Sequence, residues 1–270
     1  MHGESLHPHD IDITTPSVAR MYDYFLGGVD NYQTDRDACE ELLETAPSTR
    51  ELVINSRLFL QRVVRYLAAS RGIDQFIDHG SGLPTRENVH EVAQRARPGA
   101  SVVYVDNDPI VLAHGRALLG KNPHTAVIHA DMRDTGFIFG HQDTHQLIDF
   151  SRPVAALFVS VLHYIEDEEA AALVENVTGR LAPGSCLVIC QRVSDRPEIR
   201  KSVTDFMRRT TKGKWGRIRE EYEVRSYFSR LDILDPPGLV EVSTWMPDND
   251  LAPKQKTFEW KEWGGVGVVP

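Results

Sequence analysis

The chain has 270 residues, 41% of them hydrophobic, and 30 lysine and arginine residues against 39 aspartate and glutamate residues give a formal net charge of -9. This length suffices for one large buried core. An acidic surface repels polyanions, so the charge argues against nucleic acid as a partner. The sequence leaves a homodimer open.

The cysteines and the termini indicate the compartment. Cys39, Cys186 and Cys190 follow no metal-ligand spacing, so we expect buried free thiols in a reducing compartment. The N-terminus has no basic segment followed by an apolar one, and no apolar stretch approaches the ~20 residues that cross a bilayer. We expect a cytoplasmic protein without a membrane partner. The histidines show no repeated metal spacing, so no metal is expected.

Residues 16–72 show the periodicity of helices. Apolar side chains from Val18 to Leu26 recur on one helical face, and Gly27-Gly28 ends that pattern. Ser48 and Glu51 have the spacing of a capping box, which predicts the start of a helix that runs toward Gly72. We therefore expect residues 1–72 to form an N-terminal helical extension, in one structural unit with residues 73–270.

Short β-branched runs then alternate with amphipathic segments. The sequence predicts strands at 75–78, 101–106, 126–130, 154–160 and 185–191, and helices at 87–96, 109–119 and 168–181. Strands separated by helices of this length imply βαβ units, and hence a parallel sheet covered on both faces. The expected fold is α/β, with a Rossmann-like, doubly wound and mostly parallel sheet.

The last part of the chain is less regular. We expect helices near 198–212 and 224–231 and strands near 239–246 and 257–263. Basic residues gather between Arg200 and Arg219, against the acidic balance of the whole chain. A solvated helix face explains them most simply. The alternative is that they line an acceptor site for an acidic or phosphorylated small molecule.

A glycine turn follows the first predicted strand, in residues 76–84, FIDHGSGLP. Ligands of doubly wound sheets bind at the carboxyl ends of the strands, where this turn lies. Gly80 and Gly82 lack a Cβ, so the backbone can turn tightly and a ligand can approach it. Pro84 suits a helix start and Thr85 is the expected N-cap.

Two classes of cofactor use such a turn. A nicotinamide or flavin site requires a third glycine and places a pyrophosphate on the helix N-terminus. Here Thr85 takes the place of that glycine, and Asp78 would repel a pyrophosphate. S-adenosylmethionine carries a sulfonium and an amino group but no phosphate, so Asp78 favours it over NAD(P).

Two further acids end the next strands. Asp106 could accept hydrogen bonds from ribose hydroxyls, and Asp131 with its neighbouring backbone could contact an adenine edge. Each acid alone could equally be a loop residue or an N-cap. Three acids at consecutive strand ends are harder to explain in that way, and Asp106 supports an adenosine ligand of either cofactor class.

With these motifs the chain resembles the class I S-adenosylmethionine-dependent methyltransferases and, more narrowly, a bacterial methyltransferase family long catalogued as a domain of unknown function. The resemblance covers nearly the whole chain. It rests on residues 19–28, Asp30-Asn31, Asp35-Arg36, Asn55-Ser56-Arg57, 75–85, Asn88-Val89-His90, 104–109, 162–165, 181–185 and 264–267.

The resemblance implies a Rossmann-like methyltransferase fold in which the segment 22–31 lies over the cofactor. The cofactor-binding residues that we expect are Tyr22, Asp78, Gly80, Ser81, Gly82, Asp106, Asn107, Asp131, Met132 and Ser160. On the substrate side we expect Asn31, Tyr164 and Arg192.

Methyl transfer needs alignment and desolvation but no nucleophilic residue of the protein. A hydroxyl acceptor would need a base, and His163, just past the fourth predicted strand, is the candidate, with a packing role as the alternative. We expect an S-adenosylmethionine-dependent methyltransferase that acts on an unidentified small molecule. The alternatives are a non-catalytic protein that binds S-adenosylmethionine or S-adenosylhomocysteine and, third, an NAD(P)-dependent oxidoreductase.

Overall fold

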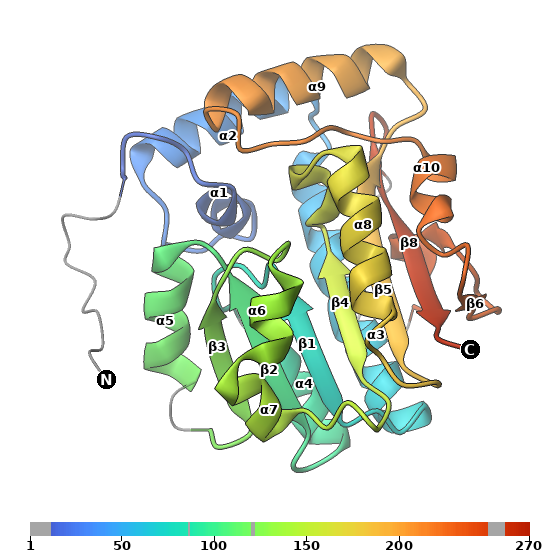
Figure 1. Cartoon of the computed structure of the whole chain (residues 1–270). Coiled ribbons are helices and arrows are strands. Elements are labelled where there is room, and N and C mark those ends of the chain that lie inside the picture. Colours follow the sequence, from blue (N-terminus) through green and yellow to red (C-terminus); the bar gives the residue numbers. More distant parts are fainter. Residues whose placement is uncertain (1–11, 86, 120–121, 248–256) are drawn as a thin grey trace.

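The computed structural model describes residues 12–85, 87–119, 122–247 and 257–270, which fold around one eight-stranded sheet (Figure 1). The strands are β1 (Gln75–His79), β2 (Ser101–Asp106), β3 (Thr125–His129), β4 (Ala155–Val159), β5 (Cys186–Val193), β6 (Asp232–Ile233), β7 (Val240–Glu241) and β8 (Lys261–Val268). Their order is β3-β2-β1-β4-β5-β8-β6, and β7 pairs with β8.

The helices of the first part are α1 (Val18–Phe25), α2 (Gln33–Thr45), α3 (Thr49–Ser70), α4 (Val89–Ala96), α5 (Pro109–Leu119), α6 (Thr135–Gly140) and α7 (Gln142–Leu147). The later ones are η2 (Leu162–Tyr164), α8 (Asp167–Thr178), α9 (Pro197–Thr210), α10 (Glu221–Ser226) and η3 (Val242–Thr244). The alternation of strand and helix from β1 to β5 confirms the predicted Rossmann-like α/β fold.

The five strands from β1 to β5 are parallel, and the chain order reverses between β1 and β4. From β1 the chain proceeds outward through β2 to β3, then returns to pair β4 with the other side of β1. Two neighbouring parallel strands whose connections leave in opposite directions leave a crevice at their carboxyl ends. This topology fixes where a ligand site can form.

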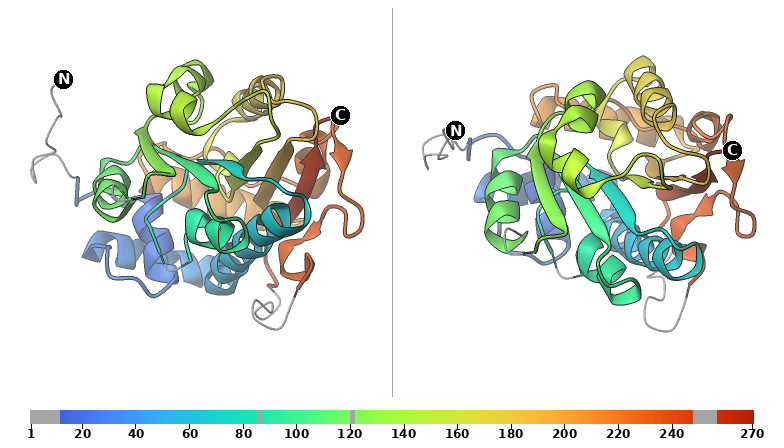
Figure 2. Two further views of the ribbon diagram at one scale, coloured as in Figure 1. Left: turned by 90° about the horizontal axis from the view of Figure 1, so that it is seen from below. Right: turned by 60° about the horizontal axis from the view of Figure 1, so that its bottom comes forward.

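Both faces of the sheet are covered, as Figure 2 shows from below. On β1, Ile77 packs with α6, α8 and α10 on one face, while its neighbour Phe76 packs with α3 and α4 on the other. Strand residues alternate between the two faces, and here both positions are apolar because neither face meets water. Cys186 and Cys190 lie on the same face, buried as predicted.

The N-terminal helices extend this core at one end of the sheet. In Figure 1, α1, α2 and α9 lie beyond the carboxyl ends of the parallel strands. Met21 and Phe25 of α1 join a third apolar cluster with residues of α2 and α9, and with Trp215. The predicted boundary at residue 72 falls between α3 and β1, but α3 itself packs on the sheet. The division of the chain there stays a prediction.

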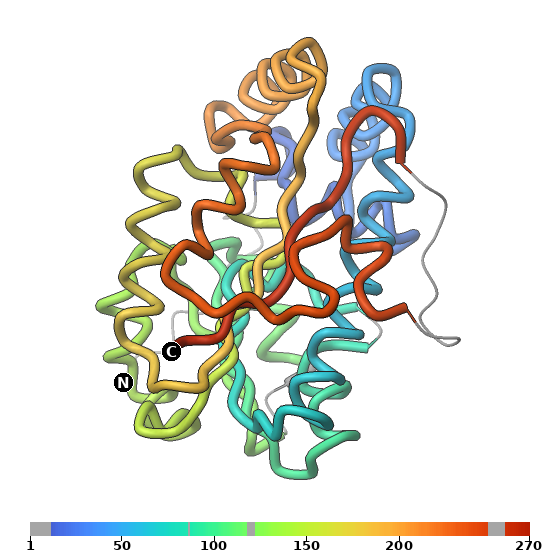
Figure 3. Tube along the Cα trace, turned by 90° about the vertical axis from the view of Figure 1, so that its right-hand side faces the viewer, coloured from blue at the N-terminus to red at the C-terminus, as the bar shows by residue number. Residues whose placement is uncertain are grey.

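The last long strand differs from its prediction. We expected a strand at 257–263, whereas β8 runs from Lys261 to Val268 and pairs antiparallel with β5 along eight residues (Figure 3). The glycines within this strand have low strand propensity, so the sequence pattern did not predict a strand there. A Cβ on Gly264 would lie 1.9 Å from the carbonyl oxygen of Ile189, so this strand needs glycine where it touches β5.

Several local predictions are also wrong. The Ser48 side chain makes no capping bond and instead donates a hydrogen bond to Glu259, so the predicted capping box is absent. Helix α4 starts at Val89 with Asn88 as N-cap, which replaces the predicted Thr85. The predicted strand 239–246 is the two-residue β7 followed by η3, and α10 ends before most of the predicted helix 224–231. For Ser48 a tertiary contact outweighs the local pattern, whereas α4 starts where Asn88 and Glu91 form a local capping box.

No helix in the described part of the chain is both long enough and apolar enough to span a membrane.

The pairing of β8 with β5 gives the first testable prediction. Gly264→Ala should lower the free energy of unfolding by about 3 kcal/mol or more, because the added methyl group overlaps the backbone of β5. Gly140→Ala is the matched control, since a Cβ at Gly140 meets no atom within 4 Å. Urea denaturation measures both. A Gly264→Ala protein as stable as the control would contradict the close approach.

Candidate functional site

A cavity of about 790 Å³ opens at the carboxyl ends of β1, β2 and β4. Its volume lies in the upper part of the range for small-molecule sites, about 300–1,000 Å³. The loops after these strands form its floor, and residues 12–22 with 211–215 form much of the remaining wall. The cavity thus occupies the crevice that the reversal of strand order creates.

The glycine turn after β1 forms one side of the cavity. Gly80 and Gly82 have φ angles of 69° and 67°, a conformation that glycine adopts readily. At Gly80 a Cβ would also lie 2.7 Å from the side chain of Val161. The amides of Gly80 and Ser81 donate to the carbonyl oxygen of Val105, at 2.8 and 3.1 Å, and tie the turn to β2. All three turn residues line the cavity, as the sequence predicts.

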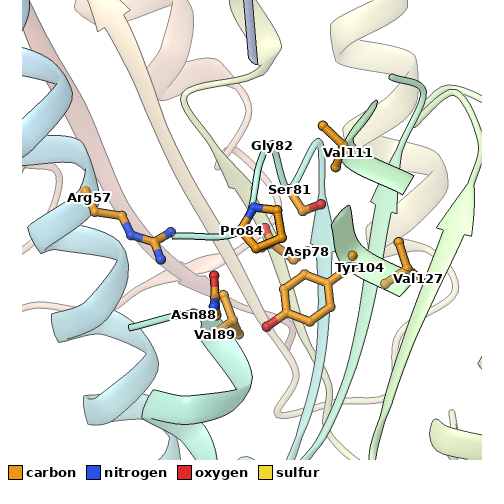
Figure 4. A pocket seen from close by; sticks show the side chains of 11 residues that line it. Arg57, Asp78, Ser81, Gly82, Pro84, Asn88, Val89, Tyr104, Val111 and Val127 are labelled. Carbon is orange, nitrogen blue, oxygen red and sulfur yellow. The ribbon is translucent and has the colours of Figure 1, made fainter. Parts of the chain in front are cut away.

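Asp78 is the penultimate residue of β1, just before this turn, and is 5% exposed. Burial raises the pKa of its carboxyl group to about 7, and the charge of Asp106 acts in the same direction. The guanidinium group of Arg57, on α3, opposes this rise and lines the same corner (Figure 4). Arg57 also donates a hydrogen bond of 2.8 Å to the carbonyl oxygen of Glu87. One corner of the cavity therefore offers both a carboxyl group and a guanidinium cation.

Asp106 ends β2 and is held by backbone donors. Its carboxylate oxygens accept from the amide of Gly82 at 2.8 Å and from the amide of Asp108 at 2.9 Å. Burial nevertheless raises the pKa of Asp106 to about 6. Each oxygen keeps a second lone pair, so the fixed carboxylate can still accept hydrogen bonds from a ligand.

The third acid, Asp131, follows β3. Arg133 donates to both of its carboxylate oxygens, at 2.9 and 2.7 Å, and lowers the pKa of Asp131. Met132 and Asn107 line the cavity beside it. The structure therefore brings together the three acids that the sequence predicts at consecutive strand ends.

The N-terminal segment is held over the cavity. The hydroxyl group of Ser17 donates a hydrogen bond of 2.7 Å to Asp108, and Ala19 packs against Leu83, Ile110 and Val111. Tyr22, one turn further on, lines the cavity, and burial raises its pKa to about 12. The predicted Tyr22 thus reaches the cavity.

Aromatic side chains form the wall on the β4 side. Ser160, immediately after β4, lines the cavity with Tyr164 and Trp215, whose ring centroids lie 5.0 Å apart. Ser160 has a φ angle of 60°, which is uncommon for a residue other than glycine. Its hydroxyl group donates to the carboxylate of Glu262 on β8, which is 2% exposed.

Three predicted residues do not line the cavity. Asn31 donates to Asp23 at 2.9 Å and organises the turn between α1 and α2. Arg192 is 4% exposed and lies 3.4 Å from a carboxylate oxygen of Glu262. His163 is fully buried behind Tyr164 and Trp215, and burial lowers its pKa well below the usual value. This position argues against His163 as a base and favours the packing role, because a proton must reach a nitrogen that faces the acceptor.

The basic residues near α9 are mostly paired with acids. Arg208 lies 2.6 Å from Glu166, and Arg209 lies 3.3 Å from Glu41. Lys201 forms an ion pair with Asp205 within α9. These pairs favour the solvated helix face for α9 itself. Lys214, beyond the end of α9, lines the cavity.

Three residues that line or flank the cavity were missing from the expected site. Arg57 lies in the Asn55-Ser56-Arg57 motif, so a signal for it was present. Trp215 stands among basic residues, and nothing in its local pattern marks it. Glu262 reaches Ser160 only because β8 pairs with β5. In the described part of the chain, no group of three or more His, Cys, Asp or Glu side chains could hold a metal ion.

Comparisons with known proteins agree on one family. A family model described as S-adenosyl methyltransferase matches residues 4–270. A candidate methyltransferase from Thermobifida fusca YX is 39% identical, covers 98% of this chain and 99% of its own, and superposes with a TM-score of 0.88. A DUF574 family protein from Streptomyces avermitilis MA-4680 is 32% identical. The match covers 96% of this chain and 99% of that protein, with a TM-score of 0.87.

The mitomycin 7-O-methyltransferase shares the fold, with 17% identity, 93% of this chain and 68% of that chain covered, and a TM-score of 0.51. A search of curated proteins gives no match.

The buried carboxyl group of Asp78 predicts a dependence of stability on pH. Its folded pKa, about 7, exceeds its unfolded value of 3.8. Between these pH values the unfolded chain releases a proton that the folded chain keeps, so the free energy of unfolding falls as the pH rises from about 4 to about 7. Above pH 7 the penalty from Asp78 remains but no longer grows. Asp78→Asn should match the original chain near pH 4 and exceed its free energy of unfolding at pH 8 by up to about 4 kcal/mol.

Urea denaturation at both pH values measures this difference. Asp149→Asn is a control of opposite sign, because hydrogen bonds from Ser151 lower the pKa of Asp149. An Asp78→Asn protein with no gain at pH 8 would show that the carboxyl group carries no such penalty.

Proposed function

The chain belongs to the S-adenosyl methyltransferase family, and from this premise we propose that it binds S-adenosylmethionine in the cavity and transfers the methyl group to a small-molecule acceptor. The observation that carries the proposal is the corner where Asp78 and Arg57 lie together beside the glycine turn. An amino acid has an ammonium group and a carboxylate. Asp78 complements the first and Arg57 complements the second.

The other acids suit the adenosine part. Asp106, held by the amides of Gly82 and Asp108, would accept hydrogen bonds from the ribose hydroxyls. Asp131, Met132 and Asn107 would contact the adenine. Tyr22 would close the cavity from above. The residues present therefore fit the cofactor.

Bound there, S-adenosylmethionine supplies an electrophilic methyl group, so the chain contributes alignment and the exclusion of water. The geranyl diphosphate methyltransferase, of the same fold at 13% identity and a TM-score of 0.51, is described in complex with S-adenosylmethionine. In this chain the apolar side chains of Leu60, Val159 and Ile165 line the cavity and would keep water from the acceptor.

The glycine turn also argues against NAD(P). A pyrophosphate needs the free amides of a helix N-terminus. Here the helix after the turn begins later, at Val89, and the side chains of Asn88 and Glu91 cap its first amides. Asp78 and Asp106 would add two carboxyl groups beside the phosphates.

Calorimetry tests the proposal. S-adenosylhomocysteine and S-adenosylmethionine should bind, and Asp106→Asn should weaken both at least about tenfold through the loss of charge-assisted hydrogen bonds. Asp149→Asn is the control, because Asp149 does not line the cavity. Binding of NAD without a response to S-adenosylhomocysteine would overturn the proposal. Transfer from labelled S-adenosylmethionine to a metabolite extract separates an enzyme from a non-catalytic binding protein.

The affinity should depend on pH. Because burial holds the pKa of Asp78 near 7, most of this carboxyl group is protonated at pH 6 and must lose a proton to pair with an ammonium group. S-adenosylhomocysteine should therefore bind about five- to tenfold more tightly at pH 7.5 than at pH 6, with proton release at the lower pH. Calorimetry in buffers of different ionisation enthalpy measures both effects. If Asp78→Asn kept the same slope, another group would be responsible.

A further inference from the structure

Ser160, which the sequence analysis expects among the cofactor-binding residues, forms a buried pair with Glu262. The cofactor contacts proposed above do not use this pair. Ser160 lines the cavity at the carboxyl end of β4, on the opposite side of β1 from Asp106 and Asp131. The adenosine part would lie on the side of those acids. The β4 side, with Tyr164 and Trp215, remains for the acceptor.

Glu262 lies just behind this wall. It accepts hydrogen bonds from Ser160 and from the thiol of Cys190, the latter at 3.3 Å. Its charge contributes to raising the pKa of Tyr22 and of Tyr164, which both line the cavity. A carboxylate on β8 is thus linked to the cavity through one serine hydroxyl.

The direction of this hydrogen bond decides what Ser160 can bind. A serine hydroxyl has one proton, and Ser160 gives its proton to Glu262. Toward the cavity its oxygen therefore presents only lone pairs. It can accept a hydrogen bond from an O–H group, but it cannot donate one to an ether or a carbonyl group.

From this geometry we propose that the acceptor is a planar aromatic compound with a hydroxyl group, which donates its proton to Ser160 while Ser160 passes its own proton to Glu262. The aromatic rings of Tyr164 and Trp215 would pack against the acceptor, and Ser160 would hold its hydroxyl group. The proposal rests on the function proposed above and assigns the class of acceptor.

The step balances in atoms and charge. The acceptor oxygen forms the new bond to the methyl carbon, and the electron pair of the broken carbon–sulfur bond stays on sulfur. The hydroxyl proton moves to Ser160 and the Ser160 proton moves to Glu262, which becomes a neutral acid. Arg192, 3.4 Å from Glu262, keeps its charge. The positive charge lost at sulfur therefore equals the charge gained by the pair of Glu262 and Arg192.

Burial suits Glu262 to this role. Desolvation raises its pKa, against the opposing effect of Arg192. A carboxylate with a raised pKa takes up a proton more readily than an exposed one. His163, the base expected from the sequence, does not line the cavity.

The test uses 1-naphthol and 2-naphthol with their methyl ethers, because these planar probes differ only in the hydroxyl proton. Binding of S-adenosylhomocysteine is measured first, and the probes are then titrated into the loaded protein. At least one naphthol should bind about tenfold or more tightly than its ether, as expected for a hydrogen bond to a charge-supported acceptor. Ser160→Ala should abolish this preference. Ser160→Gly should do the same without strain at the positive φ angle.

Glu262→Gln separates proton transfer from binding. An amide oxygen can still accept the Ser160 proton in a hydrogen bond, so the preference for a naphthol should remain, but an amide cannot take up that proton. Naphthols become strong acids when excited, so the bound probe should emit as naphtholate in the original chain and as neutral naphthol in Glu262→Gln. Ser243→Ala is the matched control, because Ser243 donates to Glu241 at 2.9 Å away from the cavity.

The outcomes separate the two proposals. If S-adenosylhomocysteine does not bind the original chain, the proposed function fails. If it binds and neither naphthol is preferred over its ether, or if Ser160→Gly keeps the preference, the acceptor class is wrong. Naphtholate emission that persists in Glu262→Gln would overturn the role of Glu262.

Discussion

The site depends on the hydrogen bonds that tie the glycine turn to β2. The amides of Gly80 and Ser81 share the carbonyl oxygen of Val105, and the amide of Gly82 binds Asp106. These bonds hold the carboxyl ends of β1 and β2 side by side and fix the orientation of the Asp106 carboxylate. Because Val161 leaves no room for a Cβ at Gly80, the turn also fixes the distance between β1 and the loop after β4. One short segment thus sets both the proposed cofactor side and the proposed acceptor side of the cavity.

The central strands and the acids at their ends could be predicted because each is a local pattern. An apolar run followed by Asp78 and two glycines needs no knowledge of distant residues. Glu262 could not be predicted, because its partner Ser160 lies 102 residues away in sequence and reaches it through the pairing of β8 with β5. The same reason applies to β8 itself. Its glycines resemble a loop in sequence, yet they are required by a backbone contact that only the folded sheet creates.

The three carboxyl groups of the cavity differ in how their surroundings shift their pKa values. Asp131 keeps a low pKa because Arg133 binds it, whereas burial raises the pKa of both Asp78 and Asp106. Two neighbouring carboxyl groups with raised pKa values weaken the fold unless positive charge or donor groups arrive from outside. Such a cost is typical of sites that await a ligand. A ligand that offsets this cost would explain why the acids lie in the crevice and not on the surface, where water would solvate them.

The position of β8 has a consequence for the order in which the strands of the sheet can pair. Among the described residues β8 follows the other strands in sequence, yet in the sheet it lies between β5 and β6. Until it emerges, β5 is an edge whose eight residues are all buried in the finished protein, and open apolar edges invite pairing with other chains. In the folded sheet β8 covers this edge of β5. Glu262 lies on β8, so the link from Ser160 to a carboxylate can form only once β8 has paired with β5.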